Sequence, residues 1–325
     1  MTTLITGASG FLGGALARAL AAEGPVLATG RDDRRCTALA ADLGSAVLRL
    51  DLAGPDAVAQ LAAAAQAAGV RRIIHAAALT APWGTRSAFF RANVTATQTV
   101  LEAARRCGVV RIVMISSPSV YFRHADQFLL PEDAPLPRPV NAYTATKRQA
   151  EALARDYGAI VLRPRGIYGP GDRALMPRLV RAMRAGPLPL MRDGRAETDL
   201  THVDDVISAV RAALVAQGLP GRVFNISGGV GLPLREVVEA VGARIGIRPR
   251  WRALPVPVVM AAATLSEARA ILTGQEPRLT RYGAGLFAHS QTLDLRAAAQ
   301  ALGWQPRVSF AEGLARTFSA GVACS

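Results

Sequence analysis

Short apolar runs alternate with alanine-rich segments through the first half of this 325-residue chain. Runs that are apolar throughout, rather than at every second position, are typical of parallel strands buried on both faces. The candidate strands are Thr3–Thr6, Val26–Thr29, Ala46–Leu50, Arg72–Ala76, Arg111–Ser116 and Ala159–Arg163. The candidate helices between them are Leu12–Glu23, Pro55–Ala68, Phe89–Cys107 and Ala142–Tyr157. Because crossovers between parallel strands are right-handed, this pattern predicts an α/β fold with a doubly wound parallel sheet.

A glycine-rich turn, TGASGFLG, follows the first candidate strand and places Gly7, Gly10 and Gly13 three residues apart. Glycines at such a turn allow backbone amides and the next helix N-terminus to approach a pyrophosphate without Cβ clashes. The position between a strand and an apolar helix predicts a dinucleotide site at this turn.

The second candidate strand ends in Thr29-Gly30-Arg31, without the acid that often binds the ribose 2′-hydroxyl of NAD. A guanidinium such as that of Arg31 can hold a 2′-phosphate instead, so we favour NADP(H) over NAD(H). The alternative is that Asp32 or Asp33 turns into the ribose site. Asp51, after the third strand, is a candidate for binding the adenine amino group or for capping a helix.

The strongest chemical signal is Tyr143-Thr-Ala-Thr-Lys147, because residues i and i+4 share one face of a helix. A free tyrosine has a pKa of about 10, and lowering it by about three units requires about 4 kcal/mol of preferential phenolate stabilisation. A nearby ammonium and an oxidised nicotinamide can jointly supply this. Lys147 is the only lysine of the chain, among 38 lysines and arginines. We therefore expect Tyr143 to transfer a proton and Lys147 to hold the nicotinamide ribose.

Ser116 and Ser117 end the fifth candidate strand, on the ligand side of the sheet. We expect Ser117 to orient the substrate oxygen, with Ser116 as the alternative. No GxSxG elbow surrounds either serine, and the four histidines show no spacing typical of a triad or of a metal site. We therefore expect neither a serine hydrolase nor a bound metal. Asn93 is expected to brace the active-site helix or a water, or to cap a helix, and His75 to pack structurally.

Composition excludes several other classes of protein. The formal charge is +14, but the arginines are scattered as singles and pairs, so we expect no nucleic-acid partner. The cysteines Cys36, Cys107 and Cys324 form no CxxC pair, which argues against a disulfide scaffold and favours a reducing compartment. A strand begins within three residues of Met1, leaving no room for a signal peptide. The longest apolar candidate, Ala253–Leu265, is shorter than the roughly 20 residues that span a bilayer. We expect a cytoplasmic protein, with peripheral membrane contact left open.

The motifs TGASGFLG, IIHAAA, SSPSVY, YTATK, LRPRGIYGPGD and THVDDV resemble, in order, those of the extended short-chain dehydrogenase/reductase family, the NAD-dependent epimerase/dehydratase superfamily. The C-terminal tail from Thr280 is most similar to the 3β-hydroxysteroid dehydrogenase branch, which includes reductases of 2-alkyl-3-keto acids. The resemblance implies a Rossmann fold, a nicotinamide cofactor and a centre made of Ser117, Tyr143 and Lys147. It implies cofactor contacts from Gly7, Ser9, Gly10, Phe11, Leu12, Gly13, Arg31, Asp51, Leu52, Ala76, Ala77, Ala78, Asn93, Ser116, Tyr143, Lys147, Pro164, Gly166 and Ile167.

The chain is expected to divide into a dinucleotide-binding domain, residues 1–165, and a smaller C-terminal lobe that is mainly substrate-binding, residues 166–325. Prolines and glycines become frequent after Pro164, and some later segments are expected to return to the first domain. A homodimer through helices near residues 94–104 and 142–154 is the expectation that the resemblance implies.

The resulting hypothesis is an NAD(P)-dependent oxidoreductase that interconverts a secondary alcohol and a ketone on a hydrophobic substrate, such as a 3β-hydroxysteroid or a 2-alkyl-3-keto acid. The same-fold alternative is a nucleotide-sugar epimerase, favoured by the basic lobe and by an expected turn at Met176-Pro177-Arg178. A third alternative is a non-catalytic dinucleotide sensor or RNA-binding member of the fold, favoured only by the arginine content. Tyr143 and Lys147 argue against that alternative, because a sensor needs no base.

Overall fold

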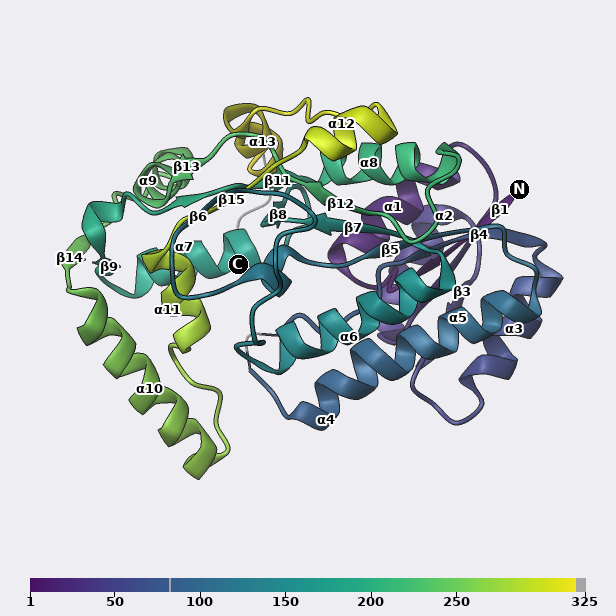
Figure 1. Cartoon of the computed structure of the whole chain (residues 1–325), viewed down its shortest axis with the longest axis horizontal. Coiled ribbons are helices and arrows are strands. Elements are labelled where there is room, and N and C mark those ends of the chain that lie inside the picture. The colour runs from purple at the N-terminus through teal and green to yellow at the C-terminus, as the bar shows by residue number, and fades with distance from the viewer. Residues whose placement is uncertain (82, 320–325) are drawn as a thin grey trace.

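A seven-stranded, wholly parallel sheet forms the centre of the computed structural model, which describes residues 1–81 and 83–319 (Figure 1). The strand order is β12-β7-β5-β4-β1-β2-β3, so the chain winds outward from β1 in both directions. The strands are β1 (Thr2–Thr6), β2 (Val26–Gly30), β3 (Val47–Arg49), β4 (Val70–His75), β5 (Arg111–Ile115), β7 (Ile160–Pro164) and β12 (Val223–Ile226). The predicted doubly wound fold is confirmed.

Helices cover both faces of this sheet. One face carries α1 (Phe11–Ala21), α2 (Asp33–Leu43), α8 (Val203–Val215) and α12 (Arg296–Leu302). The other carries α3 (Ala57–Ala67), α5 (Ala96–Arg106) and α6 (Ala142–Tyr157). Two hydrophobic cores result, one on each side of the sheet, with Ile5 and Leu162 in the first and Leu4 and Val161 in the second. Alternate residues of one strand therefore pack into opposite cores, and this is why the strands are apolar throughout.

The region predicted as one helix, Phe89–Cys107, consists of three pieces in the structure. They are α4 (Arg86–Phe89), a π-helix η1 (Phe90–Thr95) and α5. The Thr97 hydroxyl donates to the Asn93 carbonyl oxygen at 2.6 Å, inside the region where the helical ladder changes period. Hydrophobic periodicity alone did not reveal the π-helical segment η1. Such π-turns occur often at functional sites.

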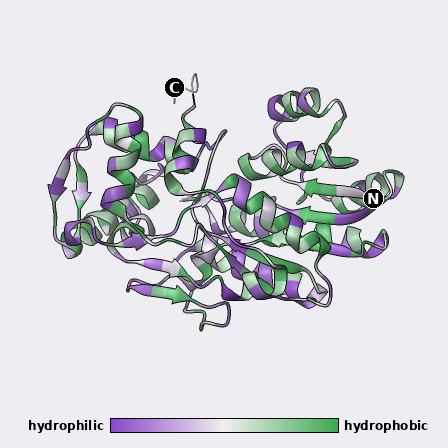
Figure 2. Ribbon diagram, turned by 90° about the horizontal axis from the view of Figure 1, so that it is seen from above, coloured by the Kyte–Doolittle hydropathy of each residue, from purple (hydrophilic) through white to green (hydrophobic). Residues whose placement is uncertain are grey.

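Segments after residue 166, together with the earlier strand Gln127–Leu130, build a second lobe, and some later segments return to the large sheet, as β12, α8 and α12 show. The lobe contains a mixed sheet of β13 (Leu232–Pro233), β10 (Glu197–Thr198), β15 (Gln291–Leu293) and β6 (Gln127–Leu130). Two small strand pairs join β8 (Ile167–Tyr168) to β11 (Thr201–His202) and β9 (Leu188–Leu190) to β14 (Trp251–Ala253). The lobe helices are α7 (Leu175–Ala185), α9 (Leu234–Arg244), α10 (Val256–Thr273), α11 (Arg281–Ala288) and α13 (Phe310–Thr317); η2 (Pro118–Tyr121) and η3 (Arg192–Gly194) are 3₁₀ turns. Figure 2 shows both hydrophobic and hydrophilic residues along most helices of the molecule.

One local expectation in this lobe was wrong. Met176-Pro177-Arg178 lies in the first turns of α7 and forms no turn of its own, which proline tolerates near a helix N-terminus. Helix α10 contains most of the apolar stretch Ala253–Leu265 and continues beyond it to Thr273, so the helix spans 18 residues. By length and composition α10 is apolar enough to cross a membrane, and only 17% of it is buried. It projects from the body of the lobe (Figure 1).

Candidate active site

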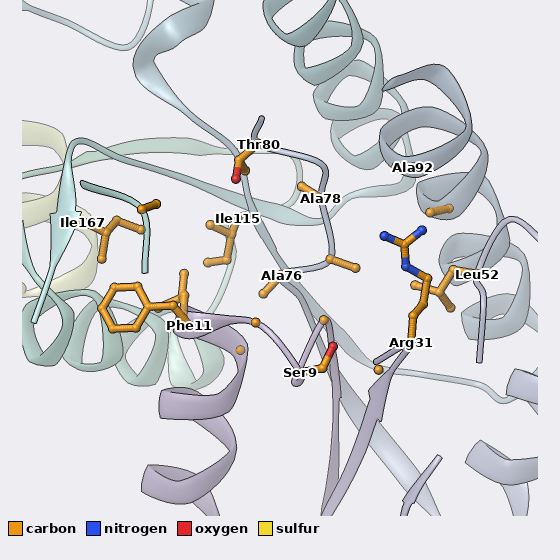
Figure 3. Close-up of a pocket in the computed structure, with 18 of the residues that line it drawn as sticks. Ser9, Phe11, Arg31, Leu52, Ala76, Ala78, Thr80, Ala92, Ile115 and Ile167 are labelled. Atoms are coloured by element: carbon orange, nitrogen blue, oxygen red, sulfur yellow. The ribbon is translucent and has the colours of Figure 1, made fainter. Parts of the chain in front are cut away.

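A cavity of about 480 Å³ lies at the carboxyl ends of β1, β2, β4, β5 and β7, where a doubly wound sheet gathers its ligands. Every site residue predicted from the sequence lines this cavity, with the single exception of Asn93. In Figure 3, Phe11 and Ile167 lie at one end, while Arg31, Leu52 and Ala92 lie at the other. The cavity is thus elongated, with the glycine turn along its floor.

The glycine turn brings the start of α1 against the first strand. Gly7 has a φ of +71°, a left-handed conformation that favours glycine. A Cβ at Gly13 would lie 2.3 Å from the Gly7 carbonyl oxygen, so the helix can approach this closely only without a side chain there. Helix α1 has no side-chain N-cap and no acidic residue in its first turn. Its amide groups therefore face the cavity, and an anionic pyrophosphate matches them in charge and hydrogen bonding.

At the adenosine end of the cavity, the basic residues after β2 line the wall and the acidic residues do not. Arg31 and Arg35 are lining residues. The Asp32 carboxylate instead caps α2 by accepting from the Arg35 amide at 3.0 Å, and Asp33 pairs with Arg49 at 3.4 Å. The alternative was that one of these acids enters the ribose site. In this structure neither acid does so.

Asp51 lines the same end of the cavity. It caps no helix, because α3 begins at Ala57 with Asp56 before it. One carboxylate oxygen accepts from the Ala53 amide at 3.1 Å, and the other lies 3.4 Å from the Arg91 guanidinium. Its side chain is held by these groups at this end of the cavity.

Helix α6 presents Tyr143 and Lys147 to the cavity from the same face. The helix begins where the Asn141 side chain accepts from the Thr144 amide at 2.8 Å, and it ends at Gly158 in a left-handed conformation. Lys147 is 3% exposed, and its ammonium donates to the Ile115 carbonyl oxygen at 2.7 Å. Burial lowers the pKa of Lys147 to about 8, against the opposing influence of the Glu151 carboxylate. The ammonium thus stays charged at neutral pH.

The environment of the Tyr143 phenol combines burial with two serine hydroxyls. Burial raises the pKa of Tyr143, and the hydroxyls of Ser117 and Ser119 oppose this increase. The groups that lower the pKa of Tyr143 in this structure are these two serines, and the Lys147 ammonium donates to the Ile115 carbonyl. The phenol is therefore protonated in this structure, with Ser117 as its polar neighbour.

Ser116 and Ser117 occupy different environments. Ser117 begins the η2 turn, and its hydroxyl accepts from the Ser119 amide at 3.2 Å. The Ser116 hydroxyl donates to Glu151 at 2.7 Å, and Glu151 also pairs with the buried guanidinium of Arg163. Because Ser116 is committed to this buried network, Ser117 is the serine that is better placed to address a substrate oxygen.

Asn93 and His75 lie behind the cavity wall. The Asn93 side chain lies within the π-helix η1, where it accepts from the Leu79 amide at 2.7 Å and donates to the Thr146 hydroxyl at 3.0 Å. It therefore braces α6 and the loop after β4, and it caps no helix. His75 contacts the hydroxyls of Thr6 at 2.8 Å and Thr97 at 2.9 Å. Burial, together with the Lys147 ammonium, lowers the pKa of His75 to about 3, so its ring is neutral.

Several lining residues were not predicted from the sequence. They are Thr29, Gly30, Arg35, Leu50, Thr80, Ala92, Ala96, Ile115, Asp172 and Ala174. Most are small or apolar and carry no chemical signal of their own. Arg35 lies in the first turn of α2, four residues after Arg31, and the cluster of arginines that follows β2 was the one available signal.

Comparison with known proteins supports the same chemistry. A 2-alkyl-3-oxoalkanoate reductase from Stenotrophomonas maltophilia is 33% identical over 97% of this chain and 98% of its own length. The sterol-4-alpha-carboxylate 3-dehydrogenase of Saccharomyces cerevisiae is 30% identical over 70% of each chain. The solved structure of MoeE5 in complex with UDP-glucuronic acid and NAD superposes with a TM-score of 0.74 and 29% identity, over 98% of each chain.

The sequence resemblance is confirmed by these findings, and the relatives are dehydrogenases and reductases. The chain is an NAD(P)-dependent enzyme that acts on CH–OH and C=O groups. The model of the NAD dependent epimerase/dehydratase family matches residues 3–227, and the chain belongs to that family.

Proposed function

We propose that this chain interconverts a ketone and a secondary alcohol on a hydrophobic substrate, using NADP(H) and the side chains of Ser117, Tyr143 and Lys147. The observation that carries the proposal is that these three side chains line the same cavity as the glycine turn. The two relatives act on a 2-alkyl-3-oxo acid and on a sterol carboxylate, as their names state. We propose a substrate of this kind, with a hydrophobic body and a carboxyl group near the reacting oxygen.

The side chains divide the work as follows. When bound, the nicotinamide ring supplies or accepts the hydride. The start of α1 would hold the pyrophosphate, and Lys147 the nicotinamide ribose. Ser117 donates a hydrogen bond to the substrate oxygen, and Tyr143 donates its proton to that oxygen as the carbonyl carbon receives hydride. The phenol is protonated at neutral pH because its ordinary pKa of about 10 lies well above that range and burial raises the pKa further, so Tyr143 can donate a proton in the reduction direction.

The preference for NADP(H) is supported by the adenosine end of the cavity. Arg31 and Arg35 line it, and a guanidinium matches a 2′-phosphate in charge and in bidentate geometry. Asp32 caps α2 and also pairs with the Arg35 guanidinium at 3.4 Å, so a bound 2′-phosphate would share Arg35 with this carboxylate. We propose that the 2′-phosphate binds between the two arginines.

The decisive experiment is the substitution Tyr143→Phe, with Tyr157→Phe on the same helix as the matched control. Tyr157 is at the far end of α6, beside Arg105, and does not line the cavity. We expect Tyr143→Phe to reduce ketone turnover by at least about 10²–10⁴-fold, the usual worth of general acid–base catalysis. Cofactor affinity should change less than about twofold, because the phenol contacts the reacting oxygen rather than the phosphates.

Cofactor affinity is measured by fluorescence titration, which also compares NADPH with NADH in the wild type, and we expect tighter binding of NADPH. Near-normal turnover in Tyr143→Phe would refute the catalytic assignment. A nucleotide-sugar epimerase, the alternative within this fold, would retain a tightly bound cofactor through purification and consume no external NADPH. Release of NAD on unfolding, together with epimerisation of a UDP-sugar, would therefore replace the proposed function.

The domain division, the cellular location and the oligomeric state are proposed from less specific features. We propose residues 1–165 as the cofactor domain and 166–325 as mainly the substrate lobe. The exposed apolar side chains Leu265, Ile271 and Leu272 on α10 support an approach to a membrane surface. Cys36 and Cys107 are free thiols, which supports a reducing cytoplasm; Cys324 lies outside the described residues. A homodimer through α5 and α6 is proposed on the family resemblance.

A further inference from the structure

A second cavity lies at the β12 edge of the large sheet, away from the glycine turn. It has a volume of about 770 Å³, which is within the usual size range of small-molecule sites. Its wall is formed by α6 on one face of the sheet, by α12 on the other, and by the loop after β6. Among the residues that the structure describes, none lines both this cavity and the catalytic one.

Arginine is concentrated in this second cavity. Five of its sixteen lining residues are arginines. Arginine makes up 37 of the 325 residues, because the chain has one lysine among 38 basic residues, and that proportion would place about two arginines among sixteen. The high arginine content of the chain therefore does not by itself account for this wall. The five are Arg148 and Arg155 of α6, Arg163 of β7, Arg222 directly before β12, and Arg296 of α12.

Two of these arginines are neutralised by carboxylates. Arg163 is buried and pairs with Glu151 behind the wall. Arg296 pairs with Asp294 at 2.6 Å, so a second guanidinium is also balanced within the protein.

The other three guanidiniums, those of Arg148, Arg155 and Arg222, have no such partner. All three side chains are exposed, and over the described part of the chain no carboxylate lies within ion-pair distance of them. Arg148 and Arg155 each donate to a backbone carbonyl oxygen, at 3.2 and 3.3 Å, and the Arg222 guanidinium lies 5.8 Å from the centroid of the Phe224 ring. These contacts do not neutralise the charges. Because a guanidinium has five N–H donors, donors remain for a further acceptor.

Two more carboxylates on the wall offset only part of this charge. Glu132 accepts from the Asn225 amide at 2.8 Å, and burial raises the pKa of Glu132. Asp133 is exposed on the same loop. Three unpaired guanidiniums therefore face two carboxylates, and the net charge of +14 of the chain adds to the positive potential.

The α6 arginines lie on the side of the helix that is turned away from α5. Arg148 and Arg155 are seven residues apart, so they share one side. Tyr157 follows Arg148 by nine residues, about two and a half turns, and its ring contacts Arg105 of α5. The second cavity thus opens beside the sheet edge rather than between α5 and α6.

We propose that this second cavity binds a small molecule with a diphosphate group, free or as an ester. A phosphate group is tetrahedral, so its oxygens can accept from guanidiniums that approach from different directions, whereas the coplanar oxygens of one carboxylate match a single guanidinium fork. Arg148 and Arg155 approach from α6 and Arg222 from the start of β12. Such a site goes beyond the proposed reaction and does not depend on it, because it shares no residue with the catalytic cavity.

The test is a calorimetric titration of inorganic pyrophosphate into the cofactor-saturated protein, without divalent cations. The protein is saturated with NADPH, or with NADH if that cofactor binds more tightly. Saturation is required because Arg31, Arg35 and the start of α1 would otherwise offer pyrophosphate another site. Citrate serves as a polycarboxylate of similar charge, and ADP as a diphosphate ester.

The first variant is Arg155→Gln/Arg222→Gln. Its matched control is Arg248→Gln/Arg250→Gln, which removes the same charge at exposed residues outside both cavities. We expect one pyrophosphate to bind per wild-type chain, and the variant to weaken this binding by at least about tenfold, because it removes charge-assisted hydrogen bonds. The control should stay within about twofold of the wild type, since exposed charges outside the cavity are screened by solvent.

The second variant, Gln300→Glu, keeps the test informative if the first does not fold. Gln300 is an exposed lining residue of α12, and the change adds a negative charge at nearly constant volume. Repulsion should weaken pyrophosphate binding by about three- to tenfold. Gln149→Glu, at an exposed residue of α6 outside the cavity, is the control and should bind like the wild type. Unchanged cofactor affinity shows that each variant is folded.

The outcomes decide between a specific site and general attraction to a basic protein. Equal weakening by the double variant and its control would overturn the site. Pyrophosphate binding that disappears once the cofactor is bound would assign the anion to the glycine turn, with the same consequence. Citrate that binds as tightly as pyrophosphate would overturn the preference for phosphate. Binding of ADP at least as tight as that of pyrophosphate would support a diphosphate ester, and binding of pyrophosphate alone would support the free anion.

Discussion

Lys147, the only lysine of the chain, is expected to reduce the stability of the folded protein. Burial lowers the pKa of Lys147 from 10.5 to about 8, while an unfolded chain restores the ordinary value. The difference of about 2.5 pKa units corresponds to about 3 kcal/mol, at 1.36 kcal/mol per unit. The side chain is 3% exposed, so solvent screens little of this penalty.

The sign of the pH dependence follows from the depressed pKa. Below pH 8 the ammonium is charged in both states, and the full penalty on folding is present. Between about pH 8 and 10.5 the unfolded chain binds more protons than the folded one, so stability rises by about 1.4 kcal/mol per pH unit. Above that range the group is neutral in both states, and its contribution is constant.

The perturbation is Lys147→Met, which removes the charge and keeps an unbranched apolar chain. At pH 7 the variant avoids the penalty of about 3 kcal/mol but leaves the Ile115 carbonyl without its donor, at a cost of about 1–3 kcal/mol. We therefore expect it to be as stable as the wild type or up to about 2 kcal/mol more stable, although it is inactive. Because the lost hydrogen bond does not titrate, the stability of the variant relative to the wild type should fall by about 3 kcal/mol between pH 7 and 10.5.

Two assays measure this effect. Urea unfolding at several pH values gives the stability difference, with Arg148→Met, at the next and exposed residue, as a control for the change of one unit charge. Since the chain contains one lysine, ¹³C-lysine labelling gives a single side-chain resonance whose titration reports Lys147 directly. A midpoint above pH 10, or a stability difference that does not vary with pH, would refute the reasoning.

Two further substitutions test the surroundings of the cavity. Gly13→Ala should lower stability by about 1–3 kcal/mol and abolish cofactor binding, because its Cβ would lie 2.3 Å from a backbone carbonyl oxygen of the glycine turn. Gly14→Ala, whose Cβ meets its nearest atom at 3.0 Å, should cost less in urea unfolding, and the reverse order would contradict the packing argument. Glu151→Gln should lower the free energy of unfolding by about 3–5 kcal/mol, because it leaves Arg163 unpaired. It should also shift the NMR titration of Lys147 to lower pH, because the carboxylate raises the pKa of that lysine. An unshifted titration would show that the carboxylate does not act on the ammonium.

Much of the fold could be predicted from the sequence because its signals are local. The candidate strand Val26–Thr29 appears as β2, and the candidate helix Ala142–Tyr157 matches α6, since a capping Asn141 and a terminal Gly158 lie next to it in the chain. The strand β12, Val223–Ile226, was not predicted: it is four residues long, and Asn225 interrupts its apolar pattern. Helix α2 was likewise not predicted, because its polar residues give a weak apolar stripe.

The sequence by itself determined which residue types could meet a dinucleotide and a carbonyl, since the glycine turn and the i, i+4 pair of Tyr143 and Lys147 are local patterns. Only the tertiary structure decided how individual side chains are used. Ser116 is committed to Glu151, 35 residues away, and Arg165 to Gln291, 126 residues away, and no pattern within one segment encodes such pairings. The physical reason is that burial and hydrogen bonding set the charge and availability of a polar group, and both depend on segments that only folding brings together.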